Sequence, residues 1–202
     1  MALAAQAKVL NEREFRKMLL YIANHKHAAR NKAILLTTHL AGLRVGEVAS
    51  LTLRDVLNDE GQIKDEIYLS ADQTKGDRGR TVLVPKRLQE ELLHYLQTRF
   101  GLKDLEVLNF TDTSRALFYT QKYQDRGFTP NTLAQQMHYL YKRAGVDGAS
   151  SHSGRRGFIT ALASKGANVR VLMALAGHRN IGTTQRYIEL NPAMLRTTVE
   201  MI

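Results

Sequence analysis

Two arginines, two histidines, a lysine and a tyrosine stand in short motifs whose residue types could act together on a phosphate ester. They are Arg44 in AGLRVGEVASL, Lys75 in TKGDRGR, His152 and Arg155 in HSGR, and His178 and Tyr187 in GHRNIGTTQRY. A guanidinium group offers two parallel hydrogen bonds to phosphate and stays charged. A phenol can attack phosphorus once its proton is removed or its surroundings are strongly cationic. Together these groups have the chemistry for nucleophilic attack on a phosphodiester.

Each of these residues also has an ordinary structural interpretation when it is taken alone. Arg44 could form a surface ion pair with Glu47, three residues further on. We favour a combined interpretation, in which Glu47 orients the arginine. The remaining alternatives are an exposed polar helix face for His152 and Arg155, a cap or core-edge position for His178, a solvated charge for Lys75 and a core position for Tyr187.

The composition favours one globular domain. A chain of 202 residues with 44% hydrophobic residues can bury a substantial core. No apolar run approaches the roughly 18 residues of a membrane span, and the first ten residues are too short an apolar stretch for a secretory signal. We therefore expect a cytoplasmic protein. The chain has no cysteine and no HExxH motif, so the sequence does not support a disulfide or a metal site.

Positive charge is concentrated in two segments. The formal net charge is +10, which favours a polyanionic partner such as nucleic acid. Between His152 and Leu190 the basic residues are Arg155, Arg156, Lys165, Arg170, Arg179 and Arg186, and the one acidic residue is Glu189. Between Lys75 and Arg87 the basic residues are Lys75, Arg78, Arg80, Lys86 and Arg87, and the one acidic residue is Asp77.

The elements that position these motifs can be predicted from apolar spacing and capping residues. Asn11 and Glu14 resemble a capping pair, and Leu88, Leu92 and Leu96 form an i, i+4 stripe. EIYLS and RTVLVP predict two strands of a small sheet, joined by a polar stretch. The predicted helices cover about 11–24, 28–41, 44–51, 86–100, 130–144, 154–164, 168–176, 183–190 and 192–202, with an irregular connection over 101–118.

The order and local settings of the six residues resemble the tyrosine recombinase family, also called the phage integrase family. The family pattern is an arginine in a GLRxxE turn, a lysine in a β-hairpin, an HxxR box, and GH with a tyrosine nine residues later. Each part has a match here, and the resemblance covers about residues 10 to 190. It implies a mainly α fold with a small antiparallel β-sheet (α+β), like that of the family's catalytic domain.

The resemblance implies a site-specific DNA recombinase that forms a 3′-phosphotyrosyl link and needs no cofactor or metal. It assigns Tyr187 as the nucleophile, Lys75 as the general acid for the departing 5′ oxygen, and Arg44, Arg155, His152 and His178 as phosphate stabilisers. It also implies that His152 exchanges a proton with the nucleophile. The alternatives are a type IB topoisomerase with the same chemistry and a DNA-binding regulator that has lost catalysis.

The expected partner is double-stranded DNA, with the protein associated with the nucleoid. The resemblance implies a homotetramer on two DNA sites, with a monomer as the alternative state without DNA. Ser153, Gly154 and Arg156 depart from the usual residues of the HxxR box, and Gly154 should weaken the start of its helix. The additional DNA contacts that we predict come from Arg78, Arg80, Arg156 and Arg179.

The chain is expected to be a single catalytic domain without the N-terminal helical DNA-binding domain that most members carry. We expect residues 1–102 to hold N-terminal helices and the hairpin, and residues 115–190 to hold the C-terminal helices with the HxxR, GH and tyrosine motifs. A tail helix over 192–202 would dock on its own domain or on that of a neighbour.

Overall fold

The computed structural model describes residues 7–74, 78–101, 112–120 and 126–188, together with residues 196, 199 and 200. In these ranges the chain is mainly helical and has one two-stranded antiparallel sheet, which confirms the predicted fold class. The helices are α1 (Glu12–Ala23), α2 (Ala28–Leu40), α3 (Val45–Ser50), α4 (Leu53–Val56), α5 (Lys86–Phe100), α6 (Pro130–Arg143), α7 (Ser153–Ser164), α8 (Val169–Ala176) and α9 (Ile181–Gln185). The strands are β1 (Glu66–Leu69) and β2 (Arg80–Leu83), and a short 3-10 turn, η1 (Ala71–Gln73), follows β1.

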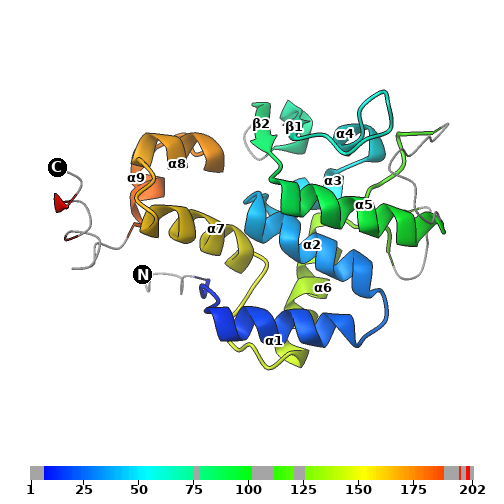
Figure 1. The fold of residues 1–202 in the computed structure, drawn as a ribbon, viewed down its shortest axis with the longest axis horizontal. Helices are drawn as coiled ribbons and strands as arrows, with labels where there is room; N and C mark the ends of the chain where they lie inside the picture. The colour runs from blue at the N-terminus through cyan, green and yellow to red at the C-terminus, as the bar shows by residue number, and fades with distance from the viewer. Residues whose placement is uncertain are drawn as a thin grey trace.

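Helix α2 runs through the centre of the molecule (Figure 1). It packs against α1, α5 and α7, while α6 packs against α1 and α3. Four successive residues of α2, Ala33 to Leu36, are no more than 1% exposed. A helix that is apolar on all sides has to be enclosed by other elements. This explains why α2 is the element around which the others assemble.

The predicted capping pair of α1 and the predicted apolar stripe of α5 are confirmed. The Asn11 side chain accepts a hydrogen bond from the Glu14 N–H at 2.9 Å, and the Glu14 carboxylate accepts one from the Asn11 N–H at 3.1 Å. This reciprocal pair satisfies two N–H groups that a helix start leaves free. In α5, Leu88, Leu92 and Leu96 are buried, as their spacing predicted.

The two strands form the predicted hairpin next to α4. Ile67 pairs with Val82 in an antiparallel register, and both side chains face the core, while Tyr68 faces outward. At the end of β1, the buried Leu69 pairs with Arg80, the first residue of β2. This register places Arg80 next to the core. Residues 75–77, which come between η1 and β2 in the sequence, lie outside the described residues.

The last described helix differs from the prediction. We expected a helix over about 183–190, but α9 begins at Ile181 and ends at Gln185. The Asn180 side chain caps the helix by accepting the Gly182 N–H at 2.7 Å. The prediction was wrong because it placed the start after this cap. Tyr187 therefore lies in a turn beyond the helix and not within it.

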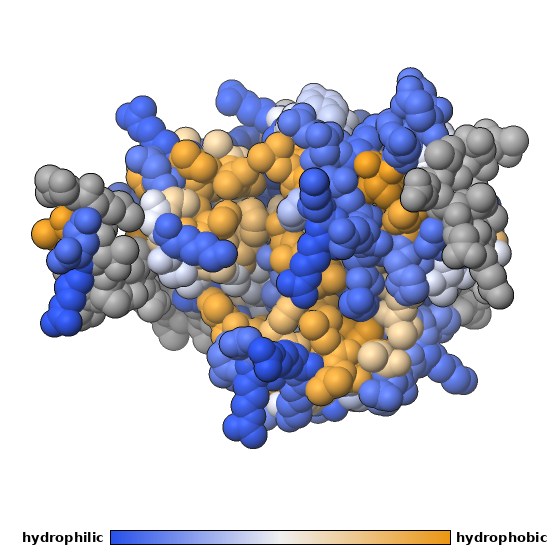
Figure 2. All heavy atoms as spheres, in the orientation of Figure 1, coloured by the Kyte–Doolittle hydropathy of each residue, from blue (hydrophilic) through white to orange (hydrophobic). Residues whose placement is uncertain are grey.

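Some predicted segments lie outside the described residues. They include 102–111 of the irregular connection and almost all of the tail helix expected at 192–202. Among the described helices, none is long and apolar enough to cross a membrane. In Figure 2, apolar side chains gather on the surface over α7 and α8, where Val171 is 51% exposed.

Candidate active site

Arg44 immediately precedes α3 and is held by Glu47. The Glu47 carboxylate accepts the Arg44 backbone N–H at 2.7 Å and an Nη1–H of its guanidinium group at 2.8 Å. The Glu47 side chain is 1% exposed, whereas that of Arg44 is 25% exposed. This is the geometry of a carboxylate that orients an arginine whose free edge still reaches solvent.

Arg80 is a second arginine on the same carboxylate. Its Nη2 lies 2.8 Å from Glu47 Oε2, and its side chain is 12% exposed. The arginine also lies against Gly177, where an added Cβ would overlap its Cδ. Arg80 was predicted as a DNA contact, but the structure places most of it inside the molecule. Local sequence carries no signal for this ion pair, because the partners are 33 residues apart.

Arg155, on the first turn of α7, is tied to two separate parts of the fold. Its Nη1 donates to the Gly42 carbonyl at 2.7 Å, and its Nη2 donates to the Ala176 carbonyl at the end of α8. The negative end of a helix dipole favours a cation in that position. Burial, followed by the charge of Arg44, lowers the pKa of Arg155 to about 9. The group therefore remains charged at neutral pH.

The close packing of α7 on α2 places the HxxR box beside Arg44. A Cβ at Gly154 would overlap the side chain of Thr38, so glycine allows the two helices to approach this closely. Sequence reasoning identified Gly154 as a weak helix start, and the structure explains its presence. His152 directly precedes α7 and is exposed.

His178 is positioned by the end of α8. Gly177 ends that helix in the left-handed conformation, with φ of 59°, and the His178 N–H then donates to the Met173 carbonyl at 3.0 Å. The His178 Nδ1 lies 2.9 Å from the Thr184 Oγ1. Burial, followed by the charge of Arg155, lowers the pKa of His178 to about 4. The imidazole is therefore neutral at physiological pH.

Tyr187 lies against His178 at the turn after α9. The two rings are stacked, with centroids 5.7 Å apart and planes inclined by 23°. The Tyr187 N–H donates to the Thr184 carbonyl at 3.0 Å, and the Arg156 guanidinium carbon lies 5.9 Å from the centre of the tyrosine ring. The tyrosine ring thus lies between a neutral imidazole and a guanidinium group, and the side chain remains partly exposed.

One cavity gathers five of the six predicted catalytic residues. It has a volume of about 620 Å³ and opens between α3, the start of α7 and the segment that runs from α8 to Tyr187. No carboxylate side chain is among its described lining residues. The predicted catalytic residues in its wall are Arg44, His152, Arg155, His178 and Tyr187, and Arg156 and Arg186 add positive charge.

A second cavity of about 520 Å³ adjoins the first and shares Arg44, His178 and Thr183 with it. Its described wall is also free of carboxylates. The predicted DNA-contacting residues that it gathers are Arg78, Arg80 and Arg179. Lys75, the predicted general acid, follows Thr74 of this wall but lies outside the described residues.

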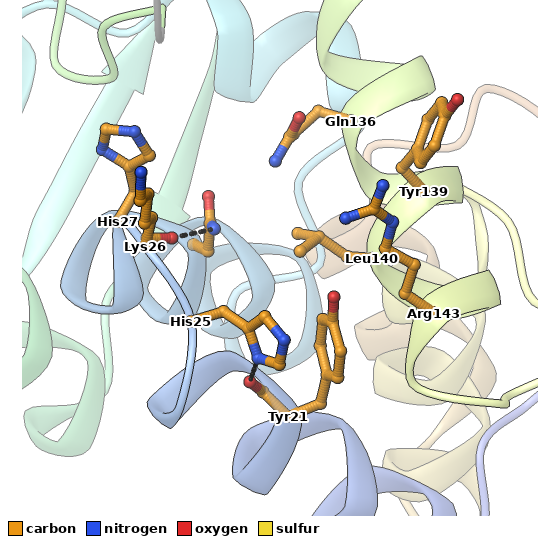
Figure 3. Close-up of a pocket in the computed structure, with 9 residues that line it drawn as sticks. Tyr21, His25, Lys26, His27, Gln136, Tyr139, Leu140 and Arg143 are labelled. Atoms are coloured by element: carbon orange, nitrogen blue, oxygen red, sulfur yellow. Dashed lines mark hydrogen bonds between the residues drawn. The ribbon is translucent and has the colours of Figure 1, made fainter.

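A third cavity, of about 570 Å³, lies between α1, the α1–α2 connection and α6 (Figure 3). Its aromatic and basic side chains include Tyr21, His25 and Arg143, and the His25 ring stacks on the Tyr21 ring. It contains none of the predicted site residues. In the described part of the chain, no three His, Cys, Asp or Glu side chains are placed to hold a metal ion.

The mainly helical fold and the clustered motifs are those of the phage integrase family. The model of the phage integrase family matches residues 8–194, and the chain belongs to this family. The resemblance read from the motifs is therefore confirmed.

Relatives and solved structures extend this result. Tyrosine recombinase XerA of Pyrococcus furiosus is 28% identical over 194 residues, covering 96% of this chain and 61% of the relative. XerA of Thermococcus kodakarensis is 32% identical over 197 residues, covering 96% and 62%. A crystal structure of XerA recombinase has a TM-score of 0.73 at 24% identity, covering 98% of this chain and 66% of that one. The catalytic domain of bacteriophage HP1 integrase has a TM-score of 0.65 at 21% identity, covering 96% and 95%.

The chain spans about three fifths of the length of these curated relatives. It covers nearly the whole of the HP1 integrase catalytic domain. The likeness in structure is therefore a likeness to the catalytic part of such proteins.

Proposed function

We propose that the chain is the catalytic part of a site-specific DNA recombinase, which breaks and rejoins strands through a 3′-phosphotyrosyl intermediate. The observation that carries this proposal is the single cavity into which Arg44, His152, Arg155, His178 and Tyr187 converge. These residues come from three separate parts of the chain. The cavity is large enough for a phosphodiester. Its described wall holds no carboxylate side chain that would repel the negative charge of the phosphate.

In the proposed reaction the Tyr187 oxygen attacks the phosphorus of one DNA strand. The new phosphorus–tyrosine bond forms as the bond from phosphorus to the 5′ oxygen of the next nucleotide breaks. The phenol proton passes to His152, and Lys75 supplies a proton to the departing 5′ oxygen. A 5′ hydroxyl of another strand reverses these steps. The number of phosphoester bonds is conserved, so the scheme requires no energy source or cofactor.

The remaining groups stabilise the crowded phosphorus. Arg44 and Arg155 would hold its non-bridging oxygens from two sides, where negative charge grows in the transition state. Both guanidinium groups are held in place, by Glu47 and by two backbone carbonyls respectively. Such fixed donors need little rearrangement at the moment of reaction. A neutral His178 would add one further N–H donor.

The adjoining basic cavity supports an extended DNA contact. Arg78 and Arg179 are exposed in its wall, and Arg156 lies beside the nucleophile. We propose that these side chains bind phosphates that flank the scissile one. Arg80 would act from within, through its ion pair with Glu47.

The names of the relatives favour a recombinase over a type IB topoisomerase or an inactive regulator, since they are tyrosine recombinases. We further propose that the protein acts on nucleoid DNA in the cytoplasm, as a homotetramer on two DNA sites. The exposed apolar surface over α8 supports a protein contact there, and the tail beyond Tyr187 is the segment that we propose to dock between protomers.

The DNA site is first identified by sequencing the DNA that is covalently attached to the protein in cells. The test then uses this sequence. A nicked duplex of that sequence, in which the cut strand cannot be rejoined, should accumulate a covalent protein–DNA product. Tyr187→Phe should abolish this product, because the phenol oxygen is lost. Tyr139→Phe is the matched control, since Tyr139 is 59% exposed and lies outside the cavity that holds Tyr187.

Adduct formation by Tyr187→Phe at the wild-type rate would contradict the proposal. Exchange of strands between two copies of the site separates a recombinase from an enzyme that only relaxes supercoils.

A further inference from the structure

Thr184 occupies an unusual place between two of the proposed catalytic residues. It is 0% exposed, although its side chain is polar and it lies on a five-residue surface helix. Its Oγ1 lies 2.9 Å from His178 Nδ1, and its carbonyl accepts the Tyr187 N–H at 3.0 Å. This threonine is not among the six residues predicted to be catalytic. The preceding threonine, Thr183, is exposed.

The direction of the hydrogen bond follows from the surroundings of Thr184. A hydroxyl carries one proton, and a buried hydroxyl has to donate it to avoid a desolvation cost. Among the described residues, His178 Nδ1 is the one group in hydrogen-bond contact with this hydroxyl. The hydroxyl therefore donates to Nδ1, which must then be the unprotonated nitrogen of a neutral ring.

The consequence lies on the other side of the ring. A neutral imidazole with an unprotonated Nδ1 carries its proton on Nε2. Phosphate oxygens accept hydrogen bonds and do not donate them, so an imidazole contributes to their stabilisation only through an N–H. The ring stays neutral because burial and the surrounding arginines lower the pKa of His178 to about 4. The hydrogen bond from the Thr184 hydroxyl to Nδ1 thus determines that the proton of the ring lies on Nε2.

We propose that Thr184 is a positioning residue, whose hydroxyl fixes the Nε2–H tautomer of His178 and whose carbonyl fixes the turn that carries Tyr187. The proposal that this tautomer serves the reaction rests on the proposed function. The tautomer itself is a property of the free protein and does not depend on the reaction. The two can therefore be tested separately.

The variants are Thr184→Val, which keeps the shape and removes the hydroxyl, and Thr184→Ser, which keeps the hydroxyl. Thr37→Val is the matched control, because Thr37 is 1% exposed and donates to the Ala33 carbonyl on α2, away from the cavity. It should reproduce any general cost of losing a buried threonine hydroxyl. A His178→Gln protein identifies the His178 signals among those of seven histidines.

The first measurement is the tautomer of His178 in the free protein, read from two-bond ¹H–¹⁵N correlation spectra of the imidazole. Wild type, Thr184→Ser and Thr37→Val should show a protonated Nε2 and an unprotonated Nδ1. Thr184→Val should show a mixture of tautomers. An unchanged tautomer in a folded Thr184→Val protein would overturn the proposal, as would loss of the Nε2–H form in folded Thr184→Ser.

The second measurement is the rate at which the nicked duplex becomes attached. In metal sites, loss of a hydrogen bond that orients a histidine costs about 10- to 100-fold, and we expect a loss of about tenfold or more for Thr184→Val. Thr184→Ser should restore most of the rate, and Thr37→Val should not lower it. A changed tautomer with an unchanged rate would overturn the positioning role. If the wild-type protein shows the expected tautomer but forms no adduct, this result would overturn the proposed function and not the statement about the tautomer.

Discussion

At the scale of single residues, the site depends on one buried carboxylate. Glu47 is 1% exposed and binds Arg44 and Arg80 through different oxygens, so two neighbouring guanidinium groups share one negative charge. Removal of one partner from a buried ion pair leaves an uncompensated charge, which is more costly than the pair is stabilising. Arg80 has two further nitrogens, Nε and Nη1, that are buried without a hydrogen-bond partner among the described residues, so it depends on this carboxylate.

Glu47→Gln should therefore reduce both stability and activity. The amide keeps the shape of the side chain but has one acceptor oxygen for two arginines. We expect a loss of about 3 kcal/mol in the free energy of unfolding, measured by urea denaturation, and a lower rate of adduct formation. Glu12→Gln is the control, because the Glu12–Arg16 ion pair is exposed and should contribute little. Equal stability of Glu47→Gln and wild type would show that this carboxylate is dispensable.

At the scale of elements, the site depends on the packing of α7 against α2. Gly154 makes this approach possible, since the side chain of Thr38 fills the space of a Cβ. Three residues further along the same helix, Gly157 meets only His39 Cδ2, at an ordinary contact distance of 3.9 Å. The two glycines thus have the same helix propensity and different surroundings.

Gly154→Ala and Gly157→Ala should consequently have opposite effects. Alanine favours a helix interior over glycine by about 0.5–1 kcal/mol, so Gly157→Ala should be neutral or stabilising. At Gly154 the added methyl group forces α7 away from α2, and overpacking of this kind costs about 1–3 kcal/mol. Urea denaturation of both proteins gives the comparison. Stabilisation by both substitutions would mean that α7 tolerates a wider separation.

At the scale of the whole molecule, positive charge gathers at two adjoining cavities. The net charge is +10, and the described walls of the two adjoining cavities hold no carboxylate side chain. Neutralisation of DNA phosphates releases bound counterions, so affinity falls as salt concentration rises. We expect weak DNA binding with a steep dependence on salt.

The dissociation constant for duplex DNA, measured by fluorescence anisotropy over a range of salt concentrations, tests this expectation. Each phosphate contact contributes about 0.9 to the slope of log affinity against log salt. Arg78→Ala and Arg179→Ala should each reduce the slope by about 1. Arg16→Ala, on α1 and paired with Glu12, should leave it unchanged. An affinity that does not respond to moderate salt would contradict an electrostatic interface.

Features set by neighbouring residues could be predicted from the sequence, and features set by distant contacts could not. The stripe Leu88, Leu92 and Leu96 predicts α5 because helical periodicity is local. The start of α9 was misplaced, since Asn180 was not recognised as its cap. The burial of Arg80 depends on a carboxylate from another element. The catalytic role of Lys75 stays a prediction, because this residue lies outside the described part of the chain.

The double attachment of Arg155 has a consequence for when the proposed reaction can begin. Its guanidinium group clasps the Gly42 carbonyl on one side and the Ala176 carbonyl at the end of α8 on the other. A molecule in which α8 had detached would keep Tyr187 but lose one of the two carbonyl groups that hold Arg155 in place. Under the proposed function, an incompletely folded copy would therefore be unable to break a strand, because Arg155 is aligned only once α8 has packed in place.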